Sequence, residues 1–292
     1  MIAVTGITGH SGKFFLKQLV DNNYPGALRC LVRESSDTSA LDASGLNIEK
    51  FRGSIDSDAD LERFVSGADT VVHIAGIMKT PRLLAAIERA GGVKHVVLVH
   101  TTGIYSKYKM ASAGYKAVEE DMQQYLDRGM NITIIRPTMI FGDLCDHNIS
   151  KFIRMVDKLP IMPEIDHGTG PMNARDLGQA YYKAAMHEQL PQLEYICSGE
   201  RPLTVHELCA LIGECLGKKT RFVSFHMGFG VFLAKALKAV TFGKKDYVEK
   251  MLRLGEDRSF SHEAASRDFG YVPDSFNDGL KREVEEYMKH GK

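Results

Sequence analysis

Apolar residues recur in short runs along the first half of the chain, and each run is followed by a segment with helical spacing of apolar and polar positions. Runs typical of buried strands cover residues 2–4, 27–32, 46–51, 70–74, 95–101 and 132–135. Helical patterns between them cover residues 13–20, 59–65, 81–90 and 113–126. Alternating strands and helices are joined by right-handed crossovers, so the pattern predicts an α/β fold of Rossmann type with a doubly wound, mostly parallel sheet.

The regular alternation ends after Phe141-Gly142. Beyond that point the pattern predicts a helix at 174–187, a short strand at 193–197 and further helices among loops. We therefore predict that residues 1–142 form the Rossmann domain, to which a core helix at 174–188 returns. Residues 143–292 form a smaller, mostly helical C-terminal substrate lobe with closing elements, above the carboxyl ends of the strands where such sheets bind ligands.

The first strand runs directly into a glycine-rich turn that reads Thr5-Gly6-Ile7-Thr8-Gly9-His10-Ser11-Gly12. Gly6 permits a tight turn, Gly9 lets the backbone approach a pyrophosphate, and Gly12 lets the helix pack closely on the strand. The helix then directs its free N–H groups at the phosphates. Because the turn follows a strand and opens a helix, it predicts a dinucleotide site rather than a glycine turn without a ligand. The loop residues predicted to bind the cofactor are Gly6, Thr8, Gly9, His10, Ser11 and Gly12.

The composition narrows the class of protein and its partners. The 292 residues are 44% hydrophobic, enough for one large α/β domain or a nucleotide domain with a smaller lobe. A formal net charge of zero gives no sign of a polyanion, so we expect no nucleic acid partner. Five cysteines without a C-x-x-C pair favour free thiols in a reducing cytoplasm. We expect no signal peptide, no membrane span and no metal site.

Seven short motifs follow one another along the whole chain. They are the glycine loop and the segments 73–76, 101–105, 116–119, 136–142, 171–177 and 268–273. With these motifs in register, the chain resembles the extended and atypical members of the short-chain dehydrogenase/reductase superfamily, close to the NAD(P)-dependent epimerase/dehydratase group. The resemblance implies an NAD(P) cofactor and hydride transfer to or from a carbonyl or alcohol of a small molecule. In relatives the long helices form a homodimer, which makes a dimer possible here.

The resemblance places further cofactor contacts where the later strands end. They are Ser54 and Ile55 after the third strand, Ala75 and Gly76 after the fourth, Lys116 on the next helix, and Pro137, Thr138 and Ile140 after the sixth strand. Ser54 or Asp56 is expected near the adenine, where relatives often carry an acid. In the alternative, Asp56 caps the helix that begins near residue 59.

Arg33 follows the second strand, where an acidic residue selects NAD and a cation accommodates the 2′-phosphate of NADP. Its planar guanidinium suits a phosphate, and Ser35 and Ser36 behind it can add hydrogen bonds. In the alternatives, Arg33 is a solvated surface charge, or the adjacent Glu34 binds the ribose of NAD. We therefore predict NADP as the cofactor, with NAD as the alternative.

The catalytic position departs from the family pattern. Active relatives carry Tyr-x-x-x-Lys on one helix face, where the lysine lowers the pKa of a tyrosine that exchanges a proton. Here Lys116 occupies the lysine position and Ser112 the tyrosine position, and Tyr115 points about 100° away from Lys116 around the helix. In the family, a serine or threonine at the end of the fifth strand completes the hydrogen-bond set. The candidate catalytic residues are Lys116, Thr101, Thr102, Ser112 and Tyr108, with Tyr105 as a second loop tyrosine.

Three functions follow from this departure. In the first, the chain is an NADP-dependent oxidoreductase or a nucleotide-sugar epimerase/dehydratase whose acid is a displaced tyrosine or a bound water. In the second, it is an atypical reductase in which Lys116 acts with Thr101 or Thr102. In the third, it binds a dinucleotide as a sensor or scaffold without turnover. A serine hydroxyl is shorter and far less acidic than a phenol, which argues against an ordinary epimerase. The fold class does not choose the substrate.

One later segment, residues 229–242, carries a wide apolar stripe with lysines around it. A basic amphipathic helix can lie on an anionic membrane, but in a two-lobed protein we expect the stripe to cover the substrate pocket or a subunit contact. His147 and His167 fall in the segment expected to roof the pocket. His73 and His100, at strand ends, are expected to be structural.

Overall fold

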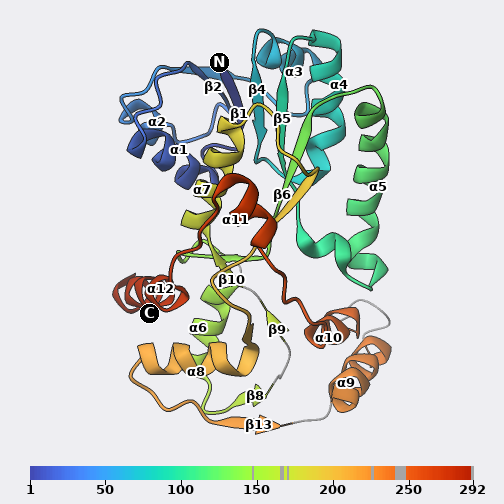
Figure 1. The fold of residues 1–292 in the computed structure, drawn as a ribbon. Helices are drawn as coiled ribbons and strands as arrows, with labels where there is room; N and C mark the ends of the chain where they lie inside the picture. The colour runs from blue at the N-terminus through green and yellow to red at the C-terminus, as the bar shows by residue number, and fades with distance from the viewer. Residues whose placement is uncertain (147, 165–167, 170, 225–226, 241–247, 291–292) are drawn as a thin grey trace.

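The computed structural model describes residues 1–146, 148–164, 168–169, 171–224, 227–240 and 248–290. Its centre is a seven-stranded parallel sheet in the order β11-β6-β5-β4-β1-β2-β3 (Figure 1). The strands are β1 (Ile2–Thr5), β2 (Leu28–Val32), β3 (Ile48–Arg52), β4 (Thr70–His73), β5 (His95–Val99), β6 (Ile132–Pro137) and β11 (Glu194–Cys197). The strand order reverses between β1 and β4, as in doubly wound sheets. The predicted Rossmann-type fold is confirmed.

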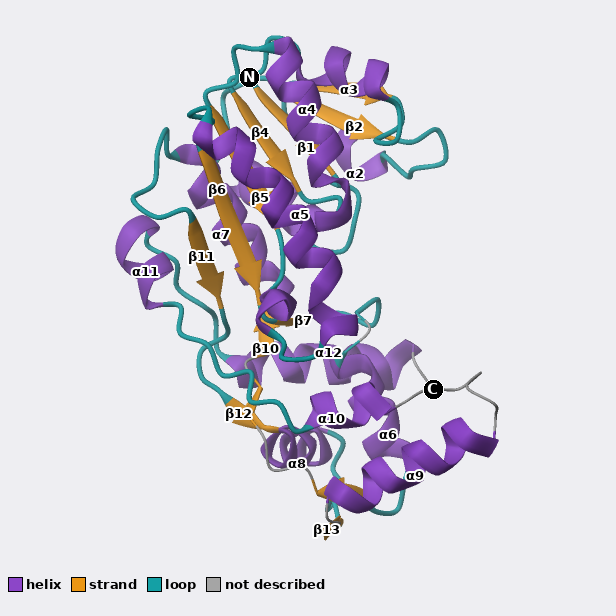
Figure 2. Ribbon diagram, turned by 90° about the vertical axis from the view of Figure 1, so that its right-hand side faces the viewer, coloured by secondary structure: helices purple, strands orange, loops and turns teal. Residues whose placement is uncertain are grey.

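Helices cover both faces of this sheet (Figures 1 and 2). One layer contains α1 (Gly12–Asp21), α7 (Ala174–Met186) and α11 (Glu263–Phe269), and the other contains α3 (Asp58–Val65), α4 (Thr80–Ala90) and α5 (Lys109–Asp127). Every residue of β1 and β5 is buried, because strands of a covered parallel sheet are enclosed on both faces. The helices α1 and α7 pack so closely that a Cβ on Gly178 would lie 2.5 Å from the carbonyl carbon of Phe14.

A smaller lobe lies beyond the carboxyl ends of the strands (Figure 2). Its own apolar core is formed mainly by α6 (Ile149–Lys158), α8 (Val205–Cys215) and α12 (Phe276–His290). Short strand pairs lead into it: β7 (Met139–Phe141) with β10 (Pro171–Asn173), β9 (Gly168–Thr169) with β12 (Leu203–Thr204), and β8 (Met162–Glu164) with β13 (Phe222–Ser224). The remaining described elements are α2 (Ser39–Asp42), η1 (Ile77–Lys79), η2 (Thr102–Tyr105), α9 (Met227–Val240) and α10 (Val248–Leu254).

The chain beyond residue 142 returns to the first core three times, through α7, the edge strand β11 and α11. The division of the domains at residue 142 stays a prediction, but the second lobe is not one uninterrupted segment.

The start of α5 determines which of its residues are helical near the site. This helix begins at Lys109, whereas the apolar pattern predicted its start at residue 113.

The apolar segment at 229–242 falls largely on α9, and residues 241–242 lie outside the described part of the chain. Two of its large apolar side chains, Phe232 and Val240, are exposed. His147 and His167 also lie outside the described residues. Among the helices that the structure describes, none has the length and apolar character needed to cross a bilayer.

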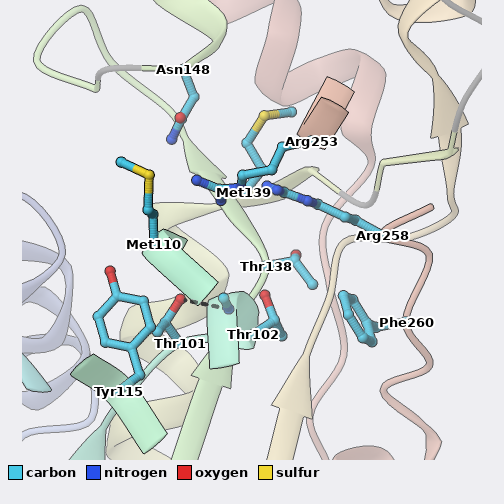
Figure 3. A pocket seen from close by; sticks show the side chains of 11 residues that line it. Thr101, Thr102, Met110, Tyr115, Thr138, Met139, Asn148, Arg253, Arg258 and Phe260 are labelled. Atoms are coloured by element: carbon cyan, nitrogen blue, oxygen red, sulfur yellow. Dashed lines mark hydrogen bonds between the residues drawn. The ribbon is translucent and has the colours of Figure 1, made fainter. Parts of the chain in front are cut away.

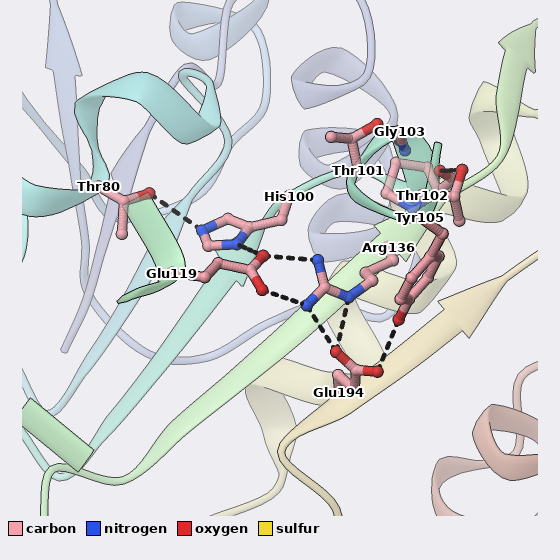
Figure 4. Close-up of polar contacts among 10 residues, drawn as sticks. Thr80, His100, Thr101, Thr102, Gly103, Tyr105, Glu119, Arg136 and Glu194 are labelled. Atoms are coloured by element: carbon pink, nitrogen blue, oxygen red, sulfur yellow. Dashed lines mark hydrogen bonds and ion pairs between the residues drawn. The ribbon is translucent and has the colours of Figure 1, made fainter. Parts of the chain in front are cut away.

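A buried ionic network ties β6 to α5 and β11 (Figure 4). Arg136 on β6 is only 2% exposed, and its guanidinium binds both carboxylate oxygens of Glu119 at 2.6 and 2.7 Å. Its Nε lies 2.8 Å from Oε2 of Glu194. His100 Nδ1 lies 2.8 Å from Glu119 and its Nε2 lies 3.1 Å from Oγ1 of Thr80. His100 is therefore a structural residue, and Glu119 sets the rotation of α5 against the sheet.

Glu283 on α12 is fully buried against the loop that follows β7. Its Oε2 accepts a hydrogen bond from the Gly142 amide at 2.9 Å. Burial, reinforced by the neighbouring Asp146 carboxylate, raises the pKa of Glu283 to about 10. A carboxyl whose pKa rises on folding stabilises the protein fully only below its unfolded pKa of about 4.3. That contribution is lost as the pH rises towards the folded pKa.

We therefore expect Glu283→Gln to raise the melting temperature at about pH 8–9 and to flatten the loss of stability from about pH 5 upwards. The glutamine amide has the shape of the protonated carboxyl, can accept a hydrogen bond from the Gly142 amide and can donate one to Asp146. Unlike the carboxyl, it has no acidic proton to lose as the pH rises. Thermal unfolding of both proteins across this pH range measures the effect. Parallel stability curves for the two proteins would contradict the assignment of a protonated Glu283.

Candidate active site

A groove of about 400 Å³ lies at the carboxyl ends of the strands around β1. Its place beside the reversal of strand order is where open α/β sheets bind ligands. Seven residues predicted to bind the cofactor line it together: Gly6, Thr8, Gly9, Arg33, Ser54, Ile55 and Ala75. These residues come from the four loops that follow β1, β2, β3 and β4. The glycine loop and the predicted adenosine end therefore form one continuous site.

The glycine loop needs its glycines for different reasons. Gly6 has φ +79°, and an added Cβ would lie 2.8 Å from the backbone nitrogen of Ala75. A Cβ on Gly12 would overlap the carbonyl oxygens of Gly6 and Ile7, so α1 can start this close to β1 only without a side chain. Beside Gly9, a Cβ meets one atom, the Gly6 oxygen at 3.1 Å. The groove is therefore open at Gly9, which suits the approach of a pyrophosphate.

His10 and Ser11 do not line this groove but connect the loop to other parts of the protein. His10 Nδ1 lies 3.0 Å from Oδ1 of Asp143, and Lys13 forms an ion pair with the same carboxylate. Burial acts to raise the pKa of Asp143, but hydrogen bonds from His10 and Lys13 outweigh it and lower that pKa. Tyr181 donates a hydrogen bond to Ser11 Oγ at 3.3 Å. These contacts anchor the loop, and cofactor contacts of His10 and Ser11 stay predictions.

The adenosine end of the groove brings Arg33 together with Ser36 and Ser54. Glu34, the alternative ribose ligand, has an 81% exposed side chain that pairs with Arg52 at 3.4 Å. Of the two candidates after the second strand, Arg33 therefore lines the groove and Glu34 does not, and the contact of Arg33 with the cofactor stays a prediction.

Asp56 also lines the groove, but it does not cap a helix. The N-cap of α3 is Ser57, whose hydroxyl oxygen accepts from the Asp60 amide at 3.3 Å. Asp56 instead pairs with Lys79 of η1. The capping alternative for Asp56 is wrong, because the side chain turns towards η1 rather than towards the start of α3.

A second cavity, of about 370 Å³, lies between the sheet and the smaller lobe (Figure 3). Thr101, Thr102 and Gly103 come from the end of β5, and Thr138 from the connection between β6 and β7. The other lining residues are Met110, Tyr115, Met139, Asn148, Arg253, Arg258 and Phe260. Two candidate threonines thus face a cavity at the carboxyl edge of the sheet, beside the dinucleotide groove. The predicted contacts at Gly76, Pro137 and Ile140 line neither space and stay predictions.

Of the two adjacent α5 residues Tyr115 and Lys116, Tyr115 lines this cavity and Lys116 does not. The reason lies one turn along the helix, where Glu119 is held against β6 by Arg136. Residues four apart share a helix face, so Tyr115 also faces the sheet, at the level where β5 ends. Its ring lies so close to the backbone that a Cβ on Gly103 would meet it at 3.2 Å. Tyr115 thus points away from Lys116 around α5, as the helix spacing predicts, and it is Tyr115 that lines this cavity.

Three candidate catalytic residues lie elsewhere. Lys116 is exposed and lines a different groove with Glu119 and Glu120, between α5 and the β6–β11 edge of the sheet. Ser112 is 3% exposed, and its hydroxyl donates to the carbonyl oxygen of Tyr108 at 3.2 Å. Tyr108 is the N-cap residue of α5 and does not line the cavity. These three residues therefore do not line the cavity with the threonines, and their joint catalytic role stays a prediction.

The two threonines differ in what their hydroxyls can still do. Thr101 Oγ1 accepts a hydrogen bond from the Gly103 amide at 3.0 Å, so its proton remains available for a ligand. Thr102 Oγ1 donates its proton to the carbonyl oxygen of Pro137 at 3.1 Å. Thr101 is therefore the better placed donor for a substrate oxygen.

Tyr105 contacts the buried ionic network and does not line the cavity. Its hydroxyl donates to Glu194 at 2.6 Å, and its ring lies 5.4 Å from the Arg136 guanidinium carbon (Figure 4). The same ring lies 5.7 Å from the Phe260 ring. Burial, with the hydrogen bond to Glu194, raises the pKa of Tyr105. A tyrosine held in this way is a poor proton donor.

Comparison with known proteins identifies the class. Residues 6–184 match the model of the NAD(P)H-binding family, so the chain belongs to that family. A curated relative, "Ceramide reductase" of Caulobacter vibrioides, is 24% identical over 176 residues. The match covers 56% of this chain and 53% of the relative, so the chain spans about half the length of that relative. The protein is thus a member of a family whose domain binds NAD(P)H, over residues that include the whole glycine loop from Gly6.

Solved structures share the fold over the whole chain. The protein gox2253 matches with a TM-score of 0.81 at 17% identity, over 100% of this chain and 98% of its own. A nucleoside-diphosphate-sugar epimerase from Pseudomonas aeruginosa matches with a TM-score of 0.74 at 18% identity, over 99% and 98%. UDP-glucose 4-epimerase from Thermotoga maritima matches with a TM-score of 0.71 at 18% identity, over 100% and 99%. At these identities the likeness establishes the epimerase-like fold.

The chemistry of the described residues gives no metal centre. Among them, no group of three or more His, Cys, Asp or Glu side chains is placed to hold an ion. All five cysteines are unpaired, and burial raises the pKa of Cys30 to about 12 and that of Cys209 to about 12. Buried thiols of this kind are packing residues rather than nucleophiles.

Proposed function

We propose that the protein is an NADP-dependent reductase that acts on a carbonyl group of a small molecule. The observation that carries the proposal is the pair of hydroxyl groups from Tyr115 and Thr101, which line one cavity beside the dinucleotide groove. Both hydroxyl groups lie at the carboxyl ends of the strands, where open α/β sheets bind their ligands. The name of the curated relative, a reductase, supports the direction of the reaction.

The residues of the groove fit a dinucleotide. The open backbone at Gly9 and the start of α1 would take the pyrophosphate, and Arg33 with Ser36 would take a 2′-phosphate. When bound, NADPH supplies the hydride that reduces a carbonyl carbon. The protein's own task is to hold the carbonyl, polarise its oxygen and provide one proton.

Tyr115 and Thr101 divide that task. The Thr101 hydroxyl, whose oxygen already accepts from Gly103, donates a hydrogen bond to the carbonyl oxygen. The Tyr115 hydroxyl transfers its proton to the same oxygen, which converts the carbonyl to an alcohol, and the phenolate recovers a proton from solvent. Hydrogen bonds that strengthen as negative charge develops on the oxygen lower the barrier, because they stabilise the transition state more than the substrate.

The experiment that tests this function is a reductase assay with NADPH and a diverse panel of aldehydes and ketones. We expect at least one carbonyl to be reduced at a rate that depends on Tyr115. Calorimetry with NADPH and NADH establishes cofactor binding in the same preparation. A protein that binds NADPH but reduces no member of a broad panel would overturn the reductase.

That outcome would favour a second function, a dinucleotide sensor. One observation supports it: in the described part of the chain no lysine lines the cavity, so the lysine that the family places beside its tyrosine has no counterpart there. A sensor would bind NADPH and change its stability or partners without turnover. A nucleotide-sugar epimerase has less support, since the family's Tyr-x-x-x-Lys pair is missing.

Cofactor choice gives a separate prediction. Arg33→Asp removes the cation that faces the adenosine end and supplies an acceptor for a ribose hydroxyl, so preference should move from NADP towards NAD. A charge-assisted contact contributes about 1.5–3 kcal/mol, which corresponds to roughly a ten- to hundred-fold change in the ratio of dissociation constants. Calorimetric titration with NADP and NAD measures it. An unchanged ratio would return Arg33 to the role of a solvated charge.

A further inference from the structure

Two arginines from the smaller lobe face the same cavity as Tyr115 and Thr101 (Figure 3). Arg253 lies on α10, and Arg258 lies in the loop that follows it. No aspartate or glutamate is among the described residues that line this cavity. The cavity therefore has hydroxyl groups on the sheet side and positive charge on the lobe side.

Acidic residues of the same segment fasten it to the start of α5. Glu256 accepts hydrogen bonds from the Lys107 amide at 2.7 Å and from the Ser106 hydroxyl at 3.0 Å. Glu249 Oε2 accepts from the Met110 amide at 3.3 Å. These carboxylates satisfy backbone and hydroxyl donors next to the helix that carries Tyr115. The segment thus holds the two arginines at a defined position above the catalytic hydroxyls.

The guanidinium groups are only partly compensated. Arg258 Nη2 lies 3.2 Å from Glu256 Oε2, an oxygen that also accepts from Ser106. Arg253 Nε is buried and has no hydrogen-bond partner among the described residues. A buried donor of a charged group is costly unless a ligand or water satisfies it. An anion in the cavity would meet this requirement for both arginines.

We propose that the substrate carries an anionic oxygen group, a carboxylate or a phosphate, bound by Arg253 and Arg258. The planar guanidinium offers paired donors that match such oxygens, and the burial of Arg253 Nε strengthens its contact with an anion. With the anion on the lobe side, the rest of a small substrate spans the cavity and its carbonyl lies at Tyr115 and Thr101. This inference rests on the proposed reductase for the carbonyl, but the anion site itself does not depend on turnover.

The first test compares matched substrates with NADPH: dihydroxyacetone phosphate against dihydroxyacetone, and benzoylformate against its methyl ester. We expect the anionic member of a pair to be preferred in kcat/KM by about 10- to 100-fold. The first pair tests whether the site accepts a phosphate, and the second pair tests whether it accepts a carboxylate. Equal kcat/KM values for charged and neutral members would overturn the proposal.

The second test changes the arginines. In Arg253→Gln and Arg258→Gln, singly and together, we expect KM for the anionic substrate to rise and its preference over the neutral substrate to shrink. Arg154→Gln, an exposed arginine on α6 of the same lobe, is the matched control and should keep the preference. NADPH affinity and circular dichroism of each variant verify that the cofactor groove and fold persist. A preference that survives in the double variant would refute the role of the arginines.

The third test separates this inference from the reductase. Inorganic phosphate and benzoylformate are titrated into the NADPH-loaded protein and followed by calorimetry. If wild type binds the anion, the double variant does not, and no carbonyl is reduced, the proposed reductase function is contradicted and the proposed anion site is supported. Reduction of neutral carbonyls without anion binding would remove the anion site and leave the reductase. Absence of anion binding in wild type, whatever the turnover, contradicts the proposal.

Discussion

Replacing Tyr115 by phenylalanine is expected to lower kcat for carbonyl reduction by about 10²- to 10⁴-fold, the usual contribution of a positioned acid. The ring keeps its packing beside Gly103, so the cavity retains its shape and only the donated proton is lost. NADPH affinity should stay unchanged, because the dinucleotide groove does not include Tyr115. Steady-state kinetics with an active carbonyl, together with calorimetric titration of NADPH, measures both quantities.

Lys116→Met is the informative companion, since the family pattern and the structure disagree about this residue. Its side chain is exposed and lines the groove between α5 and the β6–β11 edge of the sheet, which includes neither threonine. We expect Lys116→Met to change kcat little. If Lys116→Met lost activity while Tyr115→Phe kept it, the family pattern would be right and the helix phase described here would not govern catalysis.

Gly9→Val is expected to weaken NADPH binding by at least about 100-fold, equivalent to ~2.7 kcal/mol. The branched side chain would occupy the open space beside Gly9, where the pyrophosphate needs to approach the backbone. Among the described residues beyond its two neighbours in the chain, only the Gly6 oxygen lies close to the added Cβ, at 3.1 Å, so the fold should persist. Calorimetry reports the affinity, and thermal unfolding without cofactor reports the stability.

Gly9→Ala serves as the graded control and should weaken binding less, because one methyl group fills less of the same space. Gly12→Ala provides the opposite contrast. Its Cβ would overlap two backbone carbonyl oxygens, so we expect a lower melting temperature even without cofactor. A Gly9→Val protein that binds NADPH as tightly as wild type would show that the pyrophosphate does not pass this residue.

Local sequence determined the architecture of the nucleotide-binding part. The fully buried strands β1 and β5 are short apolar runs, and the amphipathic segments between strands have the period of a helix. The glycine loop was equally readable, because a strand, three spaced glycines and a helix are adjacent in the chain. Arg33 could be placed for the same reason, since the end of the second strand is a local feature.

The candidate catalytic site was not local in this sense. Motif spacing aligned Lys116 with the family's lysine, yet one residue of helix phase, about 100°, decides which side chain enters the cavity. That phase is set by the contact between Glu119 and Arg136, which lie 17 residues apart. A sequence analysis that paired Glu119 with Arg136 would have placed Glu119 against the sheet. The residue four positions earlier on the same helix face is Tyr115.

Arg253 and Arg258 were beyond the reach of the sequence. They are two among 37 basic residues of a neutral chain, and no spacing marks them as ligands. Their position depends on Glu256 reaching Ser106 across 150 residues. Sequence by itself determined the strands, the helices and the dinucleotide loop, because each depends on neighbours along the chain. Only the tertiary structure decided which side chains meet in the cavity, because that depends on helix rotation and on contacts between distant segments.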